Sequence, residues 1–283
     1  MALQGVCGLM PWPRQLAVLT ADLPWWQPYH VIGQKAVHGV LAGETVWRSL
    51  NAALPALAVP VGFVPQDTLP AGDAYEAFIY KTKQVPTRCG AHDFFNGLMW
   101  AHWPQTKAAL NALQWQDISR NGVQATRGAF RDALTLLDEN GGLLIAPDPI
   151  WAALTRRDWV TALFTLRPLW AAARLWVFGH ALLEQLLLFP RKNLTAHLWL
   201  PTPAFQQSVD VDQPLSTIDR LWATALTEDT ALASKPFTPL PVMGTPGWDV
   251  GNMDASYYAD TRIFRPLRAG QKAPHRVSHI ATT

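Results

Sequence analysis

The chain has 283 residues, of which 49% are hydrophobic and only 16% are charged, and it contains 14 tryptophans. An average soluble domain has about 25% charged residues, so this composition predicts a large apolar core and excludes a disordered, collagen-like or coiled-coil chain. The net charge of +2 conceals a slightly acidic body, because the five basic residues after Asp260 have no acidic residue among them. A chain without a broad basic face is not expected to bind nucleic acid.

The organisation of the chain indicates one compact domain. No internal repeat or linker divides it, so residues 1–270 are expected to form a single unit and residues 271–283 a basic, disordered tail. The residues before Arg14 lack the charged start and unbroken apolar run of a signal peptide, and prolines interrupt the apolar stretch 49–66. We therefore expect a cytoplasmic protein without a membrane span.

The two cysteines, Cys7 and Cys89, are too few for a disulfide scaffold or a cysteine-rich zinc module. Burial is therefore expected to hold the fold, in a reducing compartment. Cys89 could also be a nucleophile, with His92 as its base and Arg88 as an activating cation. The alternative is a buried structural cysteine, since cysteine is common in protein cores.

The first third of the chain predicts a helix and a strand. Residues 43–54 have apolar side chains at helical spacing, and Pro55 ends the pattern. Residues 75–85 alternate well enough for a strand, with Phe78 and Tyr80 on one face.

The middle of the chain predicts two successive helices and a turn before a strand. Asp93 stands at the expected N-cap of an apolar helix, and Pro104 separates that helix from a second one over 105–114. The apolar run before Asn140-Gly141 fits either a helix or a strand. The turn signal of that dipeptide leads into a strand over 143–146.

The last part of the chain predicts helices, one strand and an arm. Apolar patterns indicate helices over 150–166 and over 179–187, a short strand over 172–178, and a helix over 216–226 capped by Ser216 and Asp219. The segment 246–268 is rich in turn formers and aromatic residues. It is expected to be an ordered arm or lid.

Together these elements predict an α+β fold that is mostly helical, with a few short strands packed under helices. The C-terminal arm can be ordered only by burying its aromatic side chains, which are Trp248, Tyr257, Tyr258 and Phe264. Arg265 could reach back from the arm to Asp132 or Asp138. Most of the tryptophans lie in apolar runs, where a core position is the default.

Ordered motifs carry a resemblance to a known family. In chain order they are VPTR, HDFFN, a Trp and a Pro before TKAALNAL, RDALTLLDENG, FGHALLE, and PGW-x-x-x-N with YYADTRIFRP. Over Tyr75 to Arg268 the chain resembles the bacterial family catalogued as domain of unknown function 3025. The resemblance implies no activity. Gly90 and Ala91 stand where the family often has an Asn-Trp pair, so no role that depends on that indole is expected here.

The chain has no glycine-rich phosphate loop and no G-x-S-x-G nucleophile elbow. The most specific candidate site that is left consists of imidazole and carboxylate side chains. The candidate metal ligands are His92, Asp93, Asp138, His180 and Glu184, and the candidate catalytic base is Glu139. These groups are the usual ligands of zinc, manganese or iron, and His180 and Glu184 at i,i+4 would share one helical face. We expect His92, Asp138 or Glu139, and His180 to surround one divalent ion with a position left for water. The alternative is that these residues are helix caps, turn acids and a buried imidazole.

Cations within or beside the motifs suggest an anionic ligand. They are Arg88, Lys107, Arg131, Arg265 and Arg268. Arg88 and Arg131 are the candidate clamp for carboxylate or phosphate, because guanidinium groups bind both in a bidentate manner. The sequence therefore predicts a metal-dependent, hydrolase-like enzyme that acts on a small anionic substrate. The alternative is a non-catalytic ligand-binding or structural protein, in which the polar motifs form internal ion pairs, cap helices and tie buried loops together.

Overall fold

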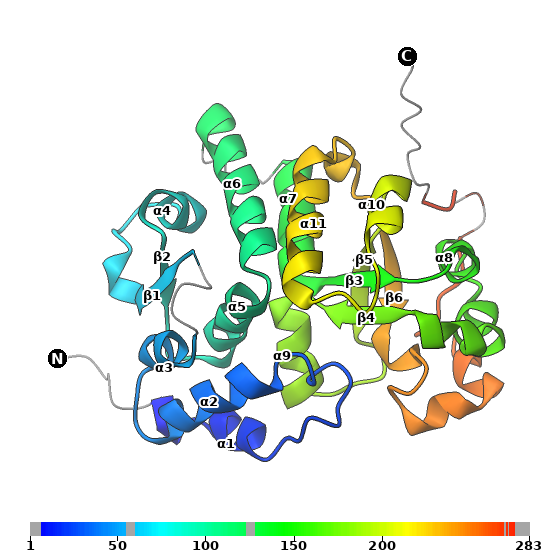
Figure 1. Ribbon diagram of the computed structural model, residues 1–283, viewed down its shortest axis with the longest axis horizontal. Helices are drawn as coiled ribbons and strands as arrows, with labels where there is room; N and C mark the ends of the chain where they lie inside the picture. The colour runs from blue at the N-terminus through cyan, green and yellow to red at the C-terminus, as the bar shows by residue number, and fades with distance from the viewer. Residues whose placement is uncertain (1–6, 55–59, 123–127, 269, 271, 275–283) are drawn as a thin grey trace.

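The computed structural model describes residues 7–54, 60–122, 128–268, 270 and 272–274, and these form a mostly helical α+β fold (Figure 1). The α-helices are α1 (Pro11–Ala17), α2 (His30–Leu41), α3 (Val46–Ala53), α4 (Tyr75–Thr82), α5 (Ala91–His102), α6 (Pro104–Asn121), α7 (Ala129–Asn140), α8 (Asp148–Thr155), α9 (His180–Leu188), α10 (Pro203–Ser208) and α11 (Leu215–Glu228). The strands are β1 (Gly62–Pro65), β2 (Gln84–Thr87), β3 (Gly141–Ile145), β4 (Arg174–Val177), β5 (Thr195–Trp199) and β6 (Phe237–Pro241).

The strands form two small sheets on either side of α6 (Figure 1). The four-stranded sheet has the order β4-β3-β5-β6, in which β3 pairs antiparallel with β4 and parallel with β5. The other sheet is the parallel pair β1-β2. Helix α6 contacts α4 on the side of the small sheet and α11 and α7 on the side of the larger one. Helix α7 thus lies between α6 and the larger sheet, which it contacts through β3 and β5.

Buried apolar side chains form one hydrophobic cluster in which tryptophan is prominent. Trp26, Trp103, Trp199 and Trp222 are among the largest side chains that are fully buried. The ring of Trp103 packs edge-on against Trp222 and Trp176, with ring centroids 5.4 and 6.2 Å apart. The core position expected for these tryptophans is therefore confirmed. None of the described helices combines the length and apolar character needed to cross a membrane.

Several predicted elements are confirmed. Helix α3 ends just before Pro55, and strands β3 and β4 occupy the predicted ranges 143–146 and 172–178 to within two residues at each end. Helix α7 ends at Asn140 and β3 begins at Gly141, as the turn signal predicts. The ambiguous run before this turn is helical.

The strand predicted over 75–85 is wrong, because Tyr75–Thr82 is helix α4. Ile79 is the buried side chain of this helix, and Tyr75, one turn earlier, also faces inward, so helical spacing overrides the apparent alternation. Lys83 ends the helix in the left-handed conformation, with φ 58°, and the chain then enters β2.

The helix predicted over 150–166 is also wrong in its extent. Helix α8 ends at Thr155, and Arg157 adopts a left-handed conformation with φ 54°. A single π-helical turn follows at Thr161–Thr165. Asp158 lies between the two segments, and its side chain accepts a hydrogen bond from the Thr161 N–H.

Two predicted helix caps, at Asp93 and Asp219, are wrong, and both carboxylates accept hydrogen bonds from other groups instead. Gly90 is the N-cap of α5, so Asp93 lies inside the first turn. Helix α11 begins after Pro214, and no side chain caps it. The buried Asp219 instead accepts hydrogen bonds from the N–H groups of Gln105 and Thr106, at 2.9 and 2.8 Å. These are free N–H groups of the first turn of α6, so α11 supplies the cap that α6 lacks in its own sequence.

We expect Asp219→Ala to lower the free energy of unfolding by about 0.5–2 kcal/mol, because it removes the only side chain acceptor seen at the start of α6 among the described residues. Asp219→Asn should retain most of the stability, since an amide oxygen also accepts. Urea unfolding of both variants measures the effect, with Gln116→Ala at an exposed position of α6 as control. An alanine variant as stable as the wild type would contradict this role.

The C-terminal arm over 246–268 is ordered as predicted, and Trp248, Tyr258 and Phe264 are buried, while Tyr257 is half-buried. The Trp159 indole N–H donates to the carbonyl of Arg265 at 3.0 Å. The expected reach of Arg265 to Asp132 or Asp138 is wrong, because its Nε–H donates to the carbonyl of Arg262. Most of the predicted tail over 271–283 lies outside the described residues.

The two cysteines form a disulfide bond, with Cα atoms 5.3 Å apart. The fold places the turn that contains Cys7 against the loop that precedes α5, so residues distant in sequence meet. Cys89 therefore has no free thiol, and its interpretation as a nucleophile with His92 as base is wrong.

Candidate functional site

A cavity of about 470 Å³ lies between α4, α5, α6, α7 and the start of α9. Seven of the predicted site residues line it: Arg88, His92, Asp93, Arg131, Asp138, Glu139 and His180. The eighth, Glu184, lies one turn along α9 from His180 and contacts His92. The structure thus brings residues from four separate motifs to one place.

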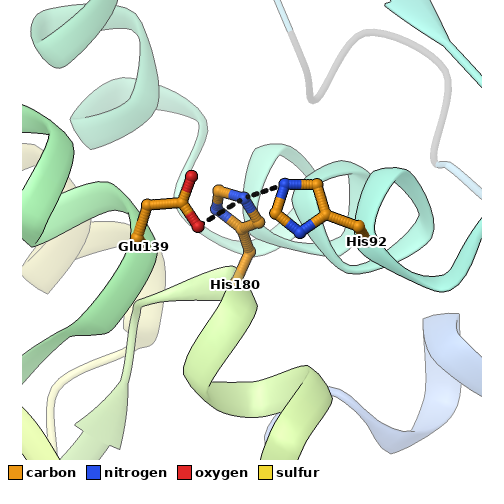
Figure 2. Close-up of side chains that lie close together, drawn as sticks. All are labelled: His92, Glu139 and His180. Atoms are coloured by element: carbon orange, nitrogen blue, oxygen red, sulfur yellow. Dashed lines mark hydrogen bonds and ion pairs between the residues drawn. The ribbon is translucent and has the colours of Figure 1, made fainter.

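Helix ends position the three side chains drawn in Figure 2. His92 is in the first turn of α5, His180 is the first residue of α9, and Glu139 is in the last turn of α7. Gly179 allows α9 to approach α7, since a Cβ at this position would lie 2.5 Å from the backbone of Asn140 and from the carbonyl of Glu139. This close approach sets the imidazole of His180 beside Glu139.

The side chains of His92, Glu139 and His180 each offer one ligand atom, and these atoms lie within 4.8 Å of one another. The two Nε2 atoms of the histidines are 3.1 Å apart, and Nε2 of His180 is 3.5 Å from the Glu139 carboxylate (Figure 2). Asp93, Asp138 and Glu184 are outside this group of three.

The outer nitrogen of each histidine contacts a group that can only accept a hydrogen bond. Nδ1 of His180 lies 2.8 Å from the carbonyl oxygen of Asp138 and donates to it. Nδ1 of His92 lies 3.4 Å from the carboxylate of Glu184. When both rings are neutral with their protons at Nδ1, the two Nε2 atoms both carry lone pairs and lie only 3.1 Å apart. In that arrangement the lone pairs repel each other unless a cation or a proton binds them.

The surroundings of the two histidines shift their pKa values in opposite directions. Burial lowers the pKa of His180 to about 4, so its ring is neutral near pH 7. The hydrogen bond to Glu184 raises the pKa of His92, whose side chain is 44% exposed. Burial also acts on Asp138, but Lys107 and His180 outweigh it and hold the pKa of this carboxyl below its usual range.

Lys107 is a buried cation in the wall of the cavity. Its Nζ donates to the Asp138 carboxylate at 2.5 Å and to the side-chain oxygen of Asn96 at 2.8 Å. Asn96 in turn donates to the hydroxyl of Tyr75 at 3.3 Å. This network fixes the end of α7 that carries Asp138 and Glu139 against α5 and α6.

Sequence reasoning missed the acidic side of this cavity. Glu76 lines it from α4, and its carboxylate accepts a hydrogen bond from the Asn111 amide at 2.6 Å. Burial raises the pKa of Glu76 above its ordinary value. The signal available in the sequence is the spacing of Lys107 and Asn111, which are polar residues one turn apart on the inward face of α6.

The two predicted clamp residues differ in their partners. Arg88 forms a bidentate pair with Asp93, at 2.8 and 3.1 Å, and its backbone N–H also donates to that carboxylate. Arg131 lines the cavity with a buried Nε that has no hydrogen-bond partner within the described residues. An N–H group left in this way is a ready donor for a ligand anion.

The pairing of Asp93 with Arg88 gives a testable expectation. We expect Asp93→Asn to cost about 1 kcal/mol in unfolding free energy, since the amide still accepts from the Arg88 N–H but loses the charge. Asp93→Ala should cost about 2 kcal/mol. Metal content, measured by elemental analysis, should remain that of the wild type in both. A fall in metal content would place Asp93 among the ligands.

Comparison with known protein families matches residues 61–268 to the family described as protein of unknown function (DUF3025). No curated protein matches the chain, and no solved structure does. The matched range covers the cavity wall from α4 to α9 and continues through the C-terminal arm. The chain therefore belongs to the DUF3025 family of proteins of unknown function.

Proposed function

We propose that the chain is a divalent-metal-dependent hydrolase that acts on a small anionic substrate. The observation that carries the proposal is the facing pair of histidine Nε2 atoms, 3.1 Å apart, each with its Nδ1 proton committed to an acceptor. A metal ion resolves the repulsion between the two lone pairs. Glu139 supplies the third ligand.

The two separations measured from His180 Nε2 fit one ion, and all three ligand atoms lie within 4.8 Å of one another. Two nitrogens that bind zinc at about 2.0–2.1 Å in a tetrahedral site are about 3.3 Å apart, close to the separations of 3.1 and 3.5 Å in this group. Two histidines and one carboxylate suit zinc, manganese or iron and leave a position open to the cavity. An ion held there would supply an acidified water molecule as nucleophile.

The remaining predicted residues take supporting roles in this proposal. Asp138 and Glu184 were predicted as ligands, and instead they hold the Nδ1 side of the two imidazoles, which fixes the ring orientation as outer-shell partners do. Asp93 holds Arg88. Glu139, predicted as the base, becomes a ligand.

The cavity walls provide the groups for binding and proton transfer. Arg131 binds the anionic part of the substrate through its unpartnered Nε–H, and Lys107 adds a second positive charge in the same wall. Glu76 is the proton-transfer group, since it lines the same cavity and burial raises its pKa above its ordinary value.

The alternative function is non-catalytic ligand binding, and one observation favours it. Glu184 raises the pKa of His92, and a protonated His92 would donate its Nε2–H to the neutral His180. The two imidazoles would then join α5 to α9 without a metal, and the cavity would bind an anion without turnover.

Elemental analysis of protein purified without an affinity tag tests the proposal. We expect about one equivalent of zinc, manganese or iron per chain, loss of that metal in chelator, and recovery of its binding when the ion is added back. Hydrolysis of p-nitrophenyl phosphate should exceed that of the uncharged p-nitrophenyl acetate and should depend on the metal. Arg131→Met should raise KM about tenfold with little change in kcat. A metal-free protein that does not take up zinc, manganese or iron on titration would overturn the proposal.

A further inference from the structure

A second hollow lies on the other side of α7, away from the histidine pair. Its volume is about 550 Å³, and strands β5 and β6, the end of α8 and the C-terminal arm form its walls. Only Leu136 lines it from α7, and it shares no lining residue with the first cavity. A neighbouring hollow along the arm shares Arg157 and Arg265 with it. We call these two hollows together the arginine cleft.

The arginine cleft has positive charge and no acidic lining residue. Its cations are Arg157, Lys235, Arg262, Arg265 and Arg268. Lys235 pairs with Asp132 at 3.6 Å, and Arg262 pairs with Asp260 at 3.0 Å. Within the described residues, no ion pair is formed by Arg157 or Arg265. Burial and the nearby charges of Arg268 and Arg265 lower the pKa of Arg157, and all three arginines line the cleft.

The backbone at Arg157 is unusual for an arginine. Its φ of 54° lies in the left-handed region, where glycine normally ends a helix. The Arg157 N–H donates to the Leu154 carbonyl, and the Asp158 N–H donates to the Ala153 carbonyl, which closes the end of α8. Lys235, which also lines the cleft, is left-handed too, with φ 54°. Two cations at positions that favour glycine therefore line one cleft, and strained residues of this kind cluster at functional sites.

The rest of the lining is mostly apolar, and Trp159, Phe237 and Pro239 form part of it. Polar side chains also line it, at Asn193, Thr195, His197 and Thr261. Nδ1 of His197, on β5, is buried and has no hydrogen-bond partner within the described residues. This wall suits the ring of a ligand whose charged end meets the guanidinium groups, while His197 offers a polar contact.

We propose that the arginine cleft is a second ligand site that binds a small phosphomonoester with a ring-containing body. Two guanidinium groups that lack carboxylate partners match a dianion better than a monoanion, and a phosphomonoester carries about −1.5 to −2 charges at pH 7. Arg157 and Arg265 bind the phosphate, and Trp159 and Phe237 contact the ring. This site is independent of the proposed metal centre, since the two share no residue.

Calorimetric titration of the full chain with phenyl phosphate, at constant ionic strength, tests the second site. Phenyl phosphate should bind more tightly than inorganic phosphate, which lacks the ring, and than benzoate, which is a monoanion. Arg157→Gly should weaken binding about tenfold or more, with a melting temperature equal to or above that of the wild type because glycine relieves the backbone strain. Arg156→Ala removes the same charge from the exposed neighbour and should bind as the wild type. Arg265→Gln should weaken binding as Arg157→Gly does.

His180→Ala combined with Arg131→Met distinguishes this site from the first cavity. Binding of phenyl phosphate to the arginine cleft should survive in this double variant, whereas binding in the first cavity would be lost, because the variant lacks both a metal ligand and the Arg131 guanidinium. Equal binding of benzoate and phenyl phosphate would overturn the preference for a dianion. Wild-type affinity in both Arg157→Gly and Arg265→Gln would overturn the site.

Discussion

Purified His92→Ala and His180→Ala variants are expected to lose the bound divalent ion. The wild type should carry about one ion per chain, and each variant less than about a tenth of that, because the one remaining imidazole and Glu139 cannot hold the ion through dialysis. His92 is the cleaner test of the two. Its side chain is 44% exposed, so its removal should leave the fold and the melting behaviour of the metal-free protein largely unchanged.

Two further variants serve as a control for this expectation and as a test of the outer-shell carboxylate. His38→Ala removes an exposed histidine from α2 and should keep the full metal content. Glu184→Gln keeps an acceptor near Nδ1 of His92 but removes the charge, so metal affinity should fall about 10- to 100-fold while the ligands remain. Elemental analysis and zinc titration measure both effects. Full metal content in His92→Ala would show that the facing histidines hold no ion, and the protonated imidazole pair would then explain their geometry.

Residue chemistry and local spacing were enough to single out three side chains whose ligand atoms lie within 4.8 Å of one another in the fold. His92, Glu139 and His180 were singled out because imidazole and carboxylate groups recur in short motifs, and α5, α7 and α9 bring these motifs together. Their separate roles depend on distances that the sequence does not contain. Glu184 lies one turn along α9 from His180, and in the fold it contacts Nδ1 of His92 without joining the three ligand atoms.

The misassigned roles of the carboxylates have one physical cause, which is that a polar group finds its partner in another part of the chain. Asp219 was predicted to cap its own helix, yet it caps α6 across the interface between the two helices. Asp93 was predicted as a cap, and Arg88 holds it instead. The predicted strand over 75–85 places Glu76 on the same face as Phe78 and Tyr80, and nothing in that pattern marks it as a cavity residue. Only the packing of α4 on α6 turns it into the cavity.

Lys107→Met is expected to destabilise the protein by about 3–5 kcal/mol, because it leaves the Asp138 carboxylate without its counter-charge in a largely buried place. The side chains of Lys107 and Asp138 are only 6% and 17% exposed. Methionine fills most of the volume of the lysine stem, so the loss is electrostatic rather than a cavity effect. Asn96 would also lose its donor.

A double-mutant cycle isolates this pair. Asp138→Asn removes the charge that Lys107 balances, so Lys107→Met combined with Asp138→Asn should be more stable than the sum of the single changes by about 1–3 kcal/mol. Lys235→Met serves as the matched control, since its ion pair with Asp132 is 44% and 45% exposed and should contribute less than about 1 kcal/mol. Urea unfolding in chelator measures all four variants without a contribution from bound metal. If Lys107→Met were no more destabilising than Lys235→Met, the buried pair would not be what fixes the end of α7. The orientation of Glu139 and of the Asp138 carbonyl would then have to come from the packing of α7 against α9 at Gly179.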